Sequence, residues 1–195
     1  MKKVLIIRCP LESAEGGAEH QTMWLADGLR QRGYTIEFLG SCPVLLRWMR
    51  ERGYIVHPLN IGAPPVTLTG ALSFLWRRRH MRQCLQEAID RCSYGEPLSI
   101  FMLSLTEKLL VTEMAASEHR VYWIEHDRIG RWLRKNPWLP LLRRQHQHAT
   151  MITVSELSRD LMIECGFDAK RIVPIPNGVP LPTLPTLPQI GRAHV

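Results

Sequence analysis

Short apolar runs alternate along the chain with longer stretches whose apolar residues recur at helical spacing. Residues 4–9 form an apolar run rich in β-branched side chains, which predicts a buried strand. From Ala18 to Leu29, residues at i, i+4, i+7, i+8 and i+11 share one face of a predicted helix, and Gly33 follows as the residue that ends it. Further strands are predicted over residues 34–39, 54–59, 98–103, 121–124, 151–154 and 171–175. Further helices are predicted over residues 43–52, 70–92, 140–149 and 156–165, with another that starts at Ser104.

Strands that alternate with helices predict an α/β fold, here a Rossmann-like parallel sheet with helices on both faces. Pro174 and Pro176 weaken the last strand, because proline cannot donate to a ladder. In such sheets, ligands bind beyond the carboxyl ends of the strands. The segments expected at that edge are residues 10–17, 104–106 and 125–137, Ser155, and the chain from Asn177 onward.

Spacing also assigns the faces of several helices. Ser104 and Glu107 are spaced as a capping box. His146 and His148 lie two residues apart and point to different faces, so both are interpreted as surface residues and not as metal ligands. The inner face of the long helix is expected to hold Leu72, Leu75, Leu85, Ala88, Ile89 and Cys92.

Composition adds a size and a compartment to this picture. The 195 residues, 45% of them hydrophobic, suit one globular domain, and the formal net charge of +7 suits an anionic partner. Five cysteines without a C-x-x-C pair give no metal-ligand spacing, so we expect buried free thiols in a reducing cytoplasm and no metal. No apolar run approaches the roughly 18 residues that span a bilayer, so any membrane contact is expected to be peripheral.

Gly16 and Gly17 close the first loop just before a helix. Two glycines there let backbone N–H groups approach an anion, which the helix dipole also favours. A plain glycine turn explains the pair equally simply. The pattern is not G-x-G-x-x-G, which argues against a nicotinamide or flavin enzyme. Glu19 also suits the first turn as a helix-dipole residue.

His126 follows the strand over residues 121–124 and is therefore expected at the ligand edge, where it can bond a hydroxyl or a developing charge. A solvated loop histidine is the alternative interpretation.

Basic residues follow directly. From Arg128 to Arg144 the chain carries six basic residues, no acid, and the tryptophans Trp132 and Trp138. This pattern suits a membrane interface or a phosphorylated acceptor, or else a solvated basic face, and no nucleic-acid-binding motif occurs. Trp76 to Arg82 form a second basic cluster, whose four arginines cannot all share one helix face.

Several segments together resemble the N-terminal domain of GT-B glycosyltransferases of family 4. The first is Gly16-Gly17-Ala18-Glu19 with the helix to Gly33, and the second is His126 after a mid-domain strand. The third runs from Val154-Ser155 through Gly166 to Ile175-Pro176-Asn177-Gly178-Val179. The resemblance spans residues 3–179, and the order of the segments is more specific than any one of them.

The resemblance implies a retaining transfer of sugar from a nucleotide-sugar to a glycan or lipid-linked acceptor of the cell envelope. It implies that His126 faces the donor sugar as the catalytic residue and that Gly16 and Gly17 bind the donor diphosphate. No cofactor or metal is implied, and the location would be cytoplasmic, at or near the inner face of the plasma membrane. Charge and loop position make Glu12, Arg128 and Arg131 expected acceptor contacts, and the hinge or cleft would hold Ser155, Asn177 and Gly178.

The C-terminal end of the sequence has a different character. Residues 1–179 are expected to form the Rossmann-like domain, and residues 180–189 repeat Leu-Pro-Thr, which favours an extended interdomain linker. One codon choice for residues 190–195 matches the start of a common sequencing adapter. We therefore expect adapter read-through there and a donor-binding domain that this chain lacks.

Two alternatives stay open. One is a nucleotide-sugar epimerase on the same architecture, which needs acid and base carboxylates in the cleft; Glu12, Glu15 and Glu125 are available. The other is a non-catalytic basic module that binds an anionic membrane surface.

Overall fold

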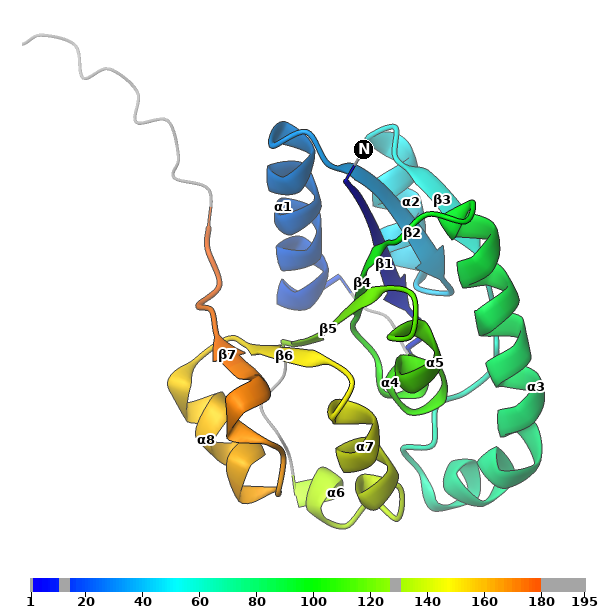
Figure 1. The fold of residues 1–195 in the computed structure, drawn as a ribbon, viewed down its shortest axis with the longest axis vertical. Helices are drawn as coiled ribbons and strands as arrows, with labels where there is room; N and C mark the ends of the chain where they lie inside the picture. The colour runs from blue at the N-terminus through cyan, green and yellow to red at the C-terminus, as the bar shows by residue number, and fades with distance from the viewer. Residues whose placement is uncertain (1, 11–14, 127–130, 180–195) are drawn as a thin grey trace, which may run out of the picture.

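A computed structural model describes residues 2–10, 15–126 and 131–179 (Figure 1). Seven strands form one sheet in the order β3-β2-β1-β4-β5-β6-β7, and every neighbouring pair is parallel. This order is the one expected of a Rossmann-like sheet, so the predicted fold class is confirmed. The strands are β1 (Lys3–Arg8), β2 (Thr35–Gly40), β3 (Ile55–Pro58), β4 (Ser99–Met102), β5 (Arg120–Glu125), β6 (Thr150–Thr153) and β7 (Ile172–Pro174).

Helices cover both faces of the sheet, because successive residues of a strand point to opposite sides. Val4 and Ile6 of β1 pack with α1 and α2, whereas Leu5 and Ile7 pack with helices of the other face. That second face carries α3, α4, α5, α7 and α8. The helices are α1 (Gly17–Gln31), α2 (Pro43–Glu51), α3 (Leu68–Ser93), α4 (Leu105–Leu110), α5 (Thr112–Ala115), α6 (Arg131–Arg134), α7 (Leu139–His146) and α8 (Glu156–Glu164), with a 3₁₀ turn over Ala169–Arg171.

The order in which the chain adds strands to the sheet changes sides at β1, while all strands stay parallel. It moves from β1 to β2 and β3 on one side, then returns through α3 to β4 on the other side. The carboxyl ends of β1 and β4 therefore lie next to each other, and the Leu103 N–H donates to the Ile7 carbonyl at 3.1 Å. This is the place where open α/β sheets bind ligands.

The expected inner face of α3 is wrong at its first two positions. Leu72 and Leu75 are 59% and 51% exposed, whereas Ala71, Phe74 and Met81 are buried. The true core stripe starts at Ala71 and continues through residues 74, 81, 85, 88 and 92, which are three, four or seven residues apart and so share one helix face. Leu72 and Leu75 are each offset by one residue, about 100° around the helix.

The sequence suggested that His146 is a surface residue, and this prediction is wrong. It is fully buried, and its ring lies 5.5 Å from that of Trp123 and 5.3 Å from that of Phe167. Burial lowers the pKa of His146, which favours the neutral ring. His148 is exposed, as predicted. His146 lies on the same buried face as Leu142 and Ala149. The sequence pattern did not show this, because histidine is polar and was not counted with the apolar positions.

Local signals in the sequence mark several element ends correctly. Gly33 has φ +81° after α1, and the capping box of Ser104 and Glu107 starts α4. The last strand, β7, lies at the sheet edge and ends at Pro174, where a missing donor is tolerated. The segment expected to be a loop over residues 125–137 contains the short helix α6. Among the residues that the structure describes, no helix is both long enough and apolar enough to cross a bilayer.

Candidate functional site

A pocket of about 360 Å³ lies on the α1 side of the sheet, over strands β4, β5 and β6. Residues of α1 form one wall, and strand residues and the segment that follows β7 form the others. Most of its lining is apolar, with a few polar groups, as is usual for small-molecule sites. The lining residues are Gln21, Trp24, Leu25, Phe101, Ile124, His126, Ile152, Val154, Ile175, Pro176, Asn177 and Gly178.

His126 lines this pocket because of its register on β5. The residue follows the last strand residue directly, and strand alternation puts it on the same side as Ile124, two positions earlier. Trp123 fills the opposite side and is 1% exposed, and its indole N–H donates to the Thr112 hydroxyl at 3.0 Å. The buried tryptophan fixes the strand, and the strand thereby places the half-buried His126 ring in the pocket.

Asn177 and Gly178 line the same pocket as His126, although about 50 residues separate them in the sequence. The Ile175 N–H donates to the Thr153 carbonyl at 2.7 Å and carries the chain past β6. The Gln21 side-chain amide then donates to the Gly178 carbonyl at 2.8 Å. This bond ties the segment after β7 to α1, so the two form adjoining walls of one pocket.

Ser155 does not line the pocket, although its neighbour Val154 does. The Ser155 hydroxyl caps α8, where it accepts the Ser158 N–H at 3.1 Å, and it also bonds the Ser158 hydroxyl at 3.0 Å. The contacts of this serine are therefore those of a helix cap.

Gly16 and Gly17 stand at the N-terminus of α1, at the same edge of the sheet. Gly16 is the N-cap residue, and a Cβ there would lie 3.2 Å from an oxygen of Glu19. A Cβ on Gly17 would meet nothing within 4 Å, so the backbone at Gly17 faces open space. Neither glycine lines the pocket, but Gly17 is four residues, about 6 Å along the helix axis, from Gln21, which does.

Glu19 has a larger role than that of a helix-dipole residue. Its carboxylate is buried and accepts a hydrogen bond from the Arg8 guanidinium at 2.5 Å. This pair joins the end of β1 to the first turn of α1. The negative charge at the helix N-terminus is therefore already paired with a cation.

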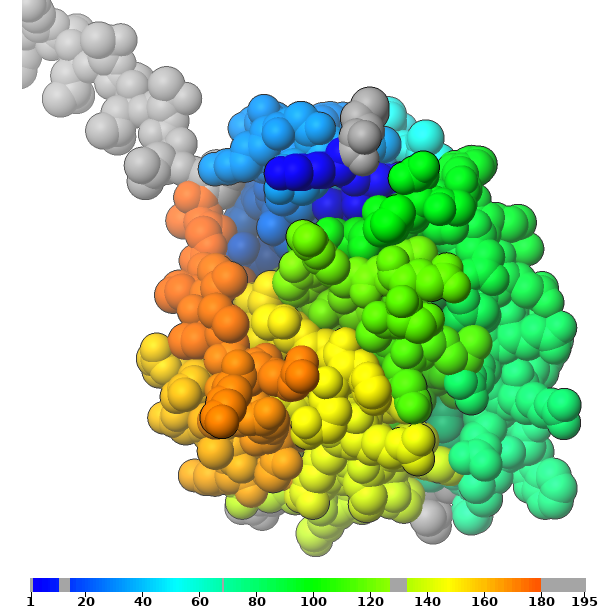
Figure 2. Space-filling model, viewed as in Figure 1, coloured from blue at the N-terminus to red at the C-terminus, as the bar shows by residue number. Residues whose placement is uncertain are grey.

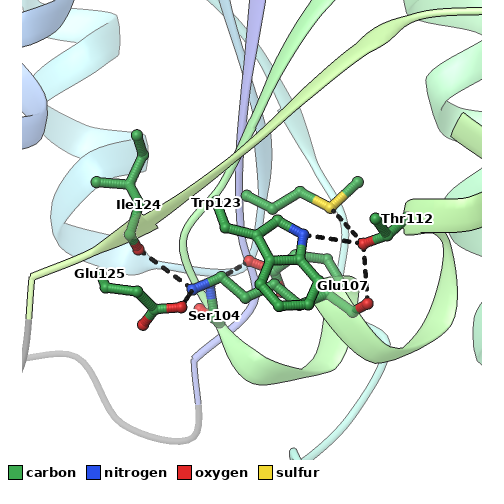
Figure 3. A network of polar contacts seen from close by, with 8 residues as sticks. Ser104, Glu107, Thr112, Trp123, Ile124 and Glu125 are labelled. Carbon is green, nitrogen blue, oxygen red and sulfur yellow. Dashed lines mark hydrogen bonds and ion pairs between the residues drawn. The ribbon is translucent and has the colours of Figure 1, made fainter. Parts of the chain in front are cut away.

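A buried polar network supports the loop after β4 and the end of β5 (Figure 3). Lys108 of α4 is 3% exposed, and its ammonium group donates to the Ile124 carbonyl at 3.2 Å and to the Glu125 carboxylate at 2.6 Å. These bonds hold the strand at the two residues before His126. Sequence reasoning missed Lys108, because nothing along the chain indicates that α4 packs against the end of β5.

Glu107 begins the same network one residue earlier. One carboxylate oxygen accepts the Ser104 N–H at 2.5 Å, which is half of the capping box (Figure 3). The side chain is completely buried, and this burial raises the pKa of Glu107 to about 7. The neighbouring Lys108 ammonium works in the other direction by favouring the carboxylate.

Of the three expected acceptor contacts, the structure describes only Arg131. Glu12 and Arg128 lie outside the described residues. Arg131 is the first residue of α6, which follows the His126 loop along the chain.

One cluster among the described residues offers three atoms that could ligate a metal. Atoms of Glu37, His57 and Cys92 lie within 4.8 Å of one another on the α3 side of the sheet. The Lys3 ammonium pairs with Glu37 at 2.6 Å, and His57 lies 2.7 Å from the other oxygen of the same carboxylate. These contacts already satisfy Glu37 as a buried acid.

The chain is similar in fold to several solved enzymes. Alr3699/HepE of Anabaena, solved in complex with UDP, matches with 16% identity and a TM-score of 0.63 over 92% of this chain and 44% of that chain. MurG of Acinetobacter baumannii matches with 11% identity and a TM-score of 0.59, over 94% and 47% of the two chains. The UDP-GlcNAc 2-epimerase of Methanocaldococcus jannaschii matches with 12% identity and a TM-score of 0.58, over 91% and 46%. The chain thus spans less than half the length of each.

Sequence comparison identifies the family. No curated protein is similar enough in sequence to count as a relative. A sequence profile of Glycosyltransferase Family 4, however, matches residues 15–182. This match includes α1, the His126 pocket and every strand after β1. The chain therefore belongs to glycosyltransferase family 4.

Proposed function

We propose that this chain forms the acceptor-side half of a retaining glycosyltransferase. The reaction moves a sugar from a nucleotide-sugar to a glycan or lipid-linked acceptor of the cell envelope. The single observation that carries the proposal is the His126 pocket in a chain of family 4. HepE was solved with UDP and with UDP-glucose, which supports a nucleotide-sugar donor here. HepE is also more than twice as long, which supports a second domain that holds most of the nucleotide.

In this proposal each pocket group has a physical task. The His126 ring bonds a hydroxyl of the donor sugar and supports positive charge at the reacting carbon, which orients the sugar more than it transfers a proton. The backbone N–H groups after Gly16 and Gly17 face the diphosphate, where leaving-group charge develops. Asn177 and Gly178 form the wall that adjoins α1, and they lead toward the second domain. The proposed mechanism uses no metal ion.

The epimerase alternative is less well supported by the described carboxylates. An epimerase needs an acid and a base that are free to exchange protons. Glu15 is paired with Arg47, and Glu125 with the buried Lys108. The third carboxylate that the sequence offered, Glu12, lies outside the described residues.

The proposed location is the cytoplasm, next to the inner face of the plasma membrane. Four of the five cysteines are buried and all five are free thiols, a state that a reducing compartment preserves.

The test uses the protein made from the complete open reading frame. It is incubated with a panel of nucleotide-sugars, starting with UDP-glucose, with and without membrane glycan and lipid extracts. The proposal predicts release of nucleoside diphosphate that depends on the acceptor, with retained anomeric configuration in the product by NMR. Inversion would contradict the retaining mechanism. An epimerised nucleotide-sugar formed without acceptor would overturn the transferase in favour of the alternative.

A further inference from the structure

A second pocket, of about 450 Å³, lies on the opposite face of the sheet from His126. It is formed by α3, α4, α5 and α7, and it shares no residue with the His126 pocket. The proposed transfer reaction gives it no role. Its lining residues are Phe74, Arg78, Arg79, Arg82, Leu109, Leu110, Glu113, Leu141, Arg144 and Gln145.

This second pocket combines an apolar interior with a cationic rim. Phe74, Leu109 and Leu110 are buried. The rim carries four exposed arginines against one carboxylate, Glu113, which lies 3.4 Å from Arg144. Arginines close together on an exposed rim repel one another, and an anion placed among them relieves that repulsion. The rim arginines are Arg78, Arg79, Arg82 and Arg144.

An exposed apolar ridge on α3 runs beside the rim. Leu72, Leu75 and Trp76 are 59%, 51% and 87% exposed, and with Arg79 they occupy positions i, i+3, i+4 and i+7 of one helix face. Figure 2 shows the side chains of α3 projecting from the right-hand edge of the molecule. Because Arg79 belongs both to this face and to the rim, ridge and rim form one surface. Apolar side chains this exposed contribute nothing to the core.

We propose that this surface docks on a membrane of anionic phospholipid. We call it the α3 surface and define it by Leu72, Leu75, Trp76, Arg78, Arg79, Arg82 and Arg144. Tryptophan and leucine insert at the boundary between headgroups and acyl chains, while the arginines bind lipid phosphates. A soluble anion or a nucleic acid explains the arginines but not the exposed ridge next to them, whereas an anionic bilayer matches both.

The α3 surface shares only Arg144 with the basic segment after His126, in which the sequence suggested a membrane contact. Trp138, in the basic segment after His126, is half-buried and packs edge-on against Phe74 at 4.9 Å between ring centroids. Its other ring contact is with Arg78, at 6.0 Å. Trp138 therefore supports the floor and rim of the second pocket, whereas Trp76 on α3 is 87% exposed.

The test is sedimentation of the 195-residue chain with vesicles of phosphatidylcholine alone or mixed with phosphatidylglycerol. One variant neutralises the rim (Arg78→Gln, Arg79→Gln, Arg82→Gln). Its matched control removes the same charge elsewhere, from the exposed Arg50, Arg91 and Arg120. A second variant removes the ridge (Leu72→Ser, Trp76→Ser). Its control places serine at the exposed Ile55 and Leu157. Circular dichroism verifies the folding of all five proteins.

The proposal predicts binding to the anionic vesicles only. Each basic residue near such a surface is worth roughly fivefold in partitioning, so the rim variant should lose about 100-fold. The ridge variant should lose at least about tenfold, and each control less than about threefold. Raising the salt from about 0.1 M to 1 M shortens the Debye length from about 10 Å to 3 Å, and it should weaken binding of the wild type far more than that of the rim variant.

Three results would overturn the proposal: no binding to anionic vesicles, equal losses in the rim variant and its charge control, or full binding by the ridge variant. Competition by inorganic phosphate, or tighter binding to a single-stranded oligonucleotide than to vesicles, would also overturn it. The assay contains no nucleotide-sugar, so its failure would count against the proposed membrane location but not against the proposed sugar transfer. Failure of the sugar transfer leaves the α3 surface untouched.

Discussion

Glu107 offers a test of the buried network that supports the end of β5. The proposed substitution is Glu107→Gln, which keeps the oxygen that accepts the Ser104 N–H but cannot ionise. Glu107 is completely buried, and its pKa is raised from 4.5 to about 7 by the loss of hydration. Wild type and variant should therefore differ in how the free energy of unfolding depends on pH.

The sign follows from proton binding. Between pH 4.5 and pH 7 the folded protein keeps the proton on Glu107 while the unfolded chain has lost it. Stability from this group is therefore complete below pH 4.5 and is lost as the pH rises through 7. With these two pKa values, the contribution falls by roughly 2 to 3 kcal/mol between pH 5 and pH 8. Glutamine has no such dependence, so the variant should gain on the wild type by about that amount.

The assay is urea unfolding of both proteins at half-unit steps from pH 5 to pH 8. The difference between the two free energies removes the contributions of all other titrating groups, including His146. A difference that stays constant within about 0.5 kcal/mol over this range would refute the argument, because it would mean that Glu107 is ionised at pH 5 in the folded protein. A difference in the free energy of unfolding that is the same at every pH is unimportant, since only the change of this difference with pH reports the proton on Glu107.

Two further predictions concern the same edge of the sheet. Lys108→Met should lower the free energy of unfolding by about 3 kcal/mol, because it leaves Glu125 without its buried partner; a loss below about 1 kcal/mol in urea titrations would contradict this. Gly40→Ala should cost at least about 3 kcal/mol, because φ is +148° and a Cβ would lie 2.1 Å from the Arg8 carbonyl oxygen. Its control, Gly17→Ala, meets open space and should change stability by less than about 1 kcal/mol; equal melting temperatures for the two variants would contradict this account.

Local patterns predicted the elements well because they depend on neighbours in the sequence. A β-branched run, a capping box and a glycine stop each act within a few residues, so the parallel sheet and most element bounds followed from them. His126 came into the pocket by the same logic, since its place depends only on where β5 ends and on strand alternation.

Contacts between distant segments could not be predicted in this way. The hydrogen bond from Gln21 to Gly178 joins residues 157 apart, and the pair of Lys108 and Glu125 depends on how α4 packs. The face of α3 was misassigned because leucine at position 72 or 75 fits an apolar stripe as well as alanine at position 71 does. Only the sheet beneath the helix decides which stripe is buried.

The most direct test of the central claim is the turnover of His126→Ala in the protein from the complete open reading frame. The control is His148→Ala, an exposed histidine that does not line the His126 pocket. The account predicts that loss of the His126 ring lowers kcat by about 100-fold with unchanged folding, because a positioned group near the reacting carbon is removed. The control should retain full activity. Undiminished kcat in His126→Ala would contradict the assignment of this pocket as the site of sugar transfer.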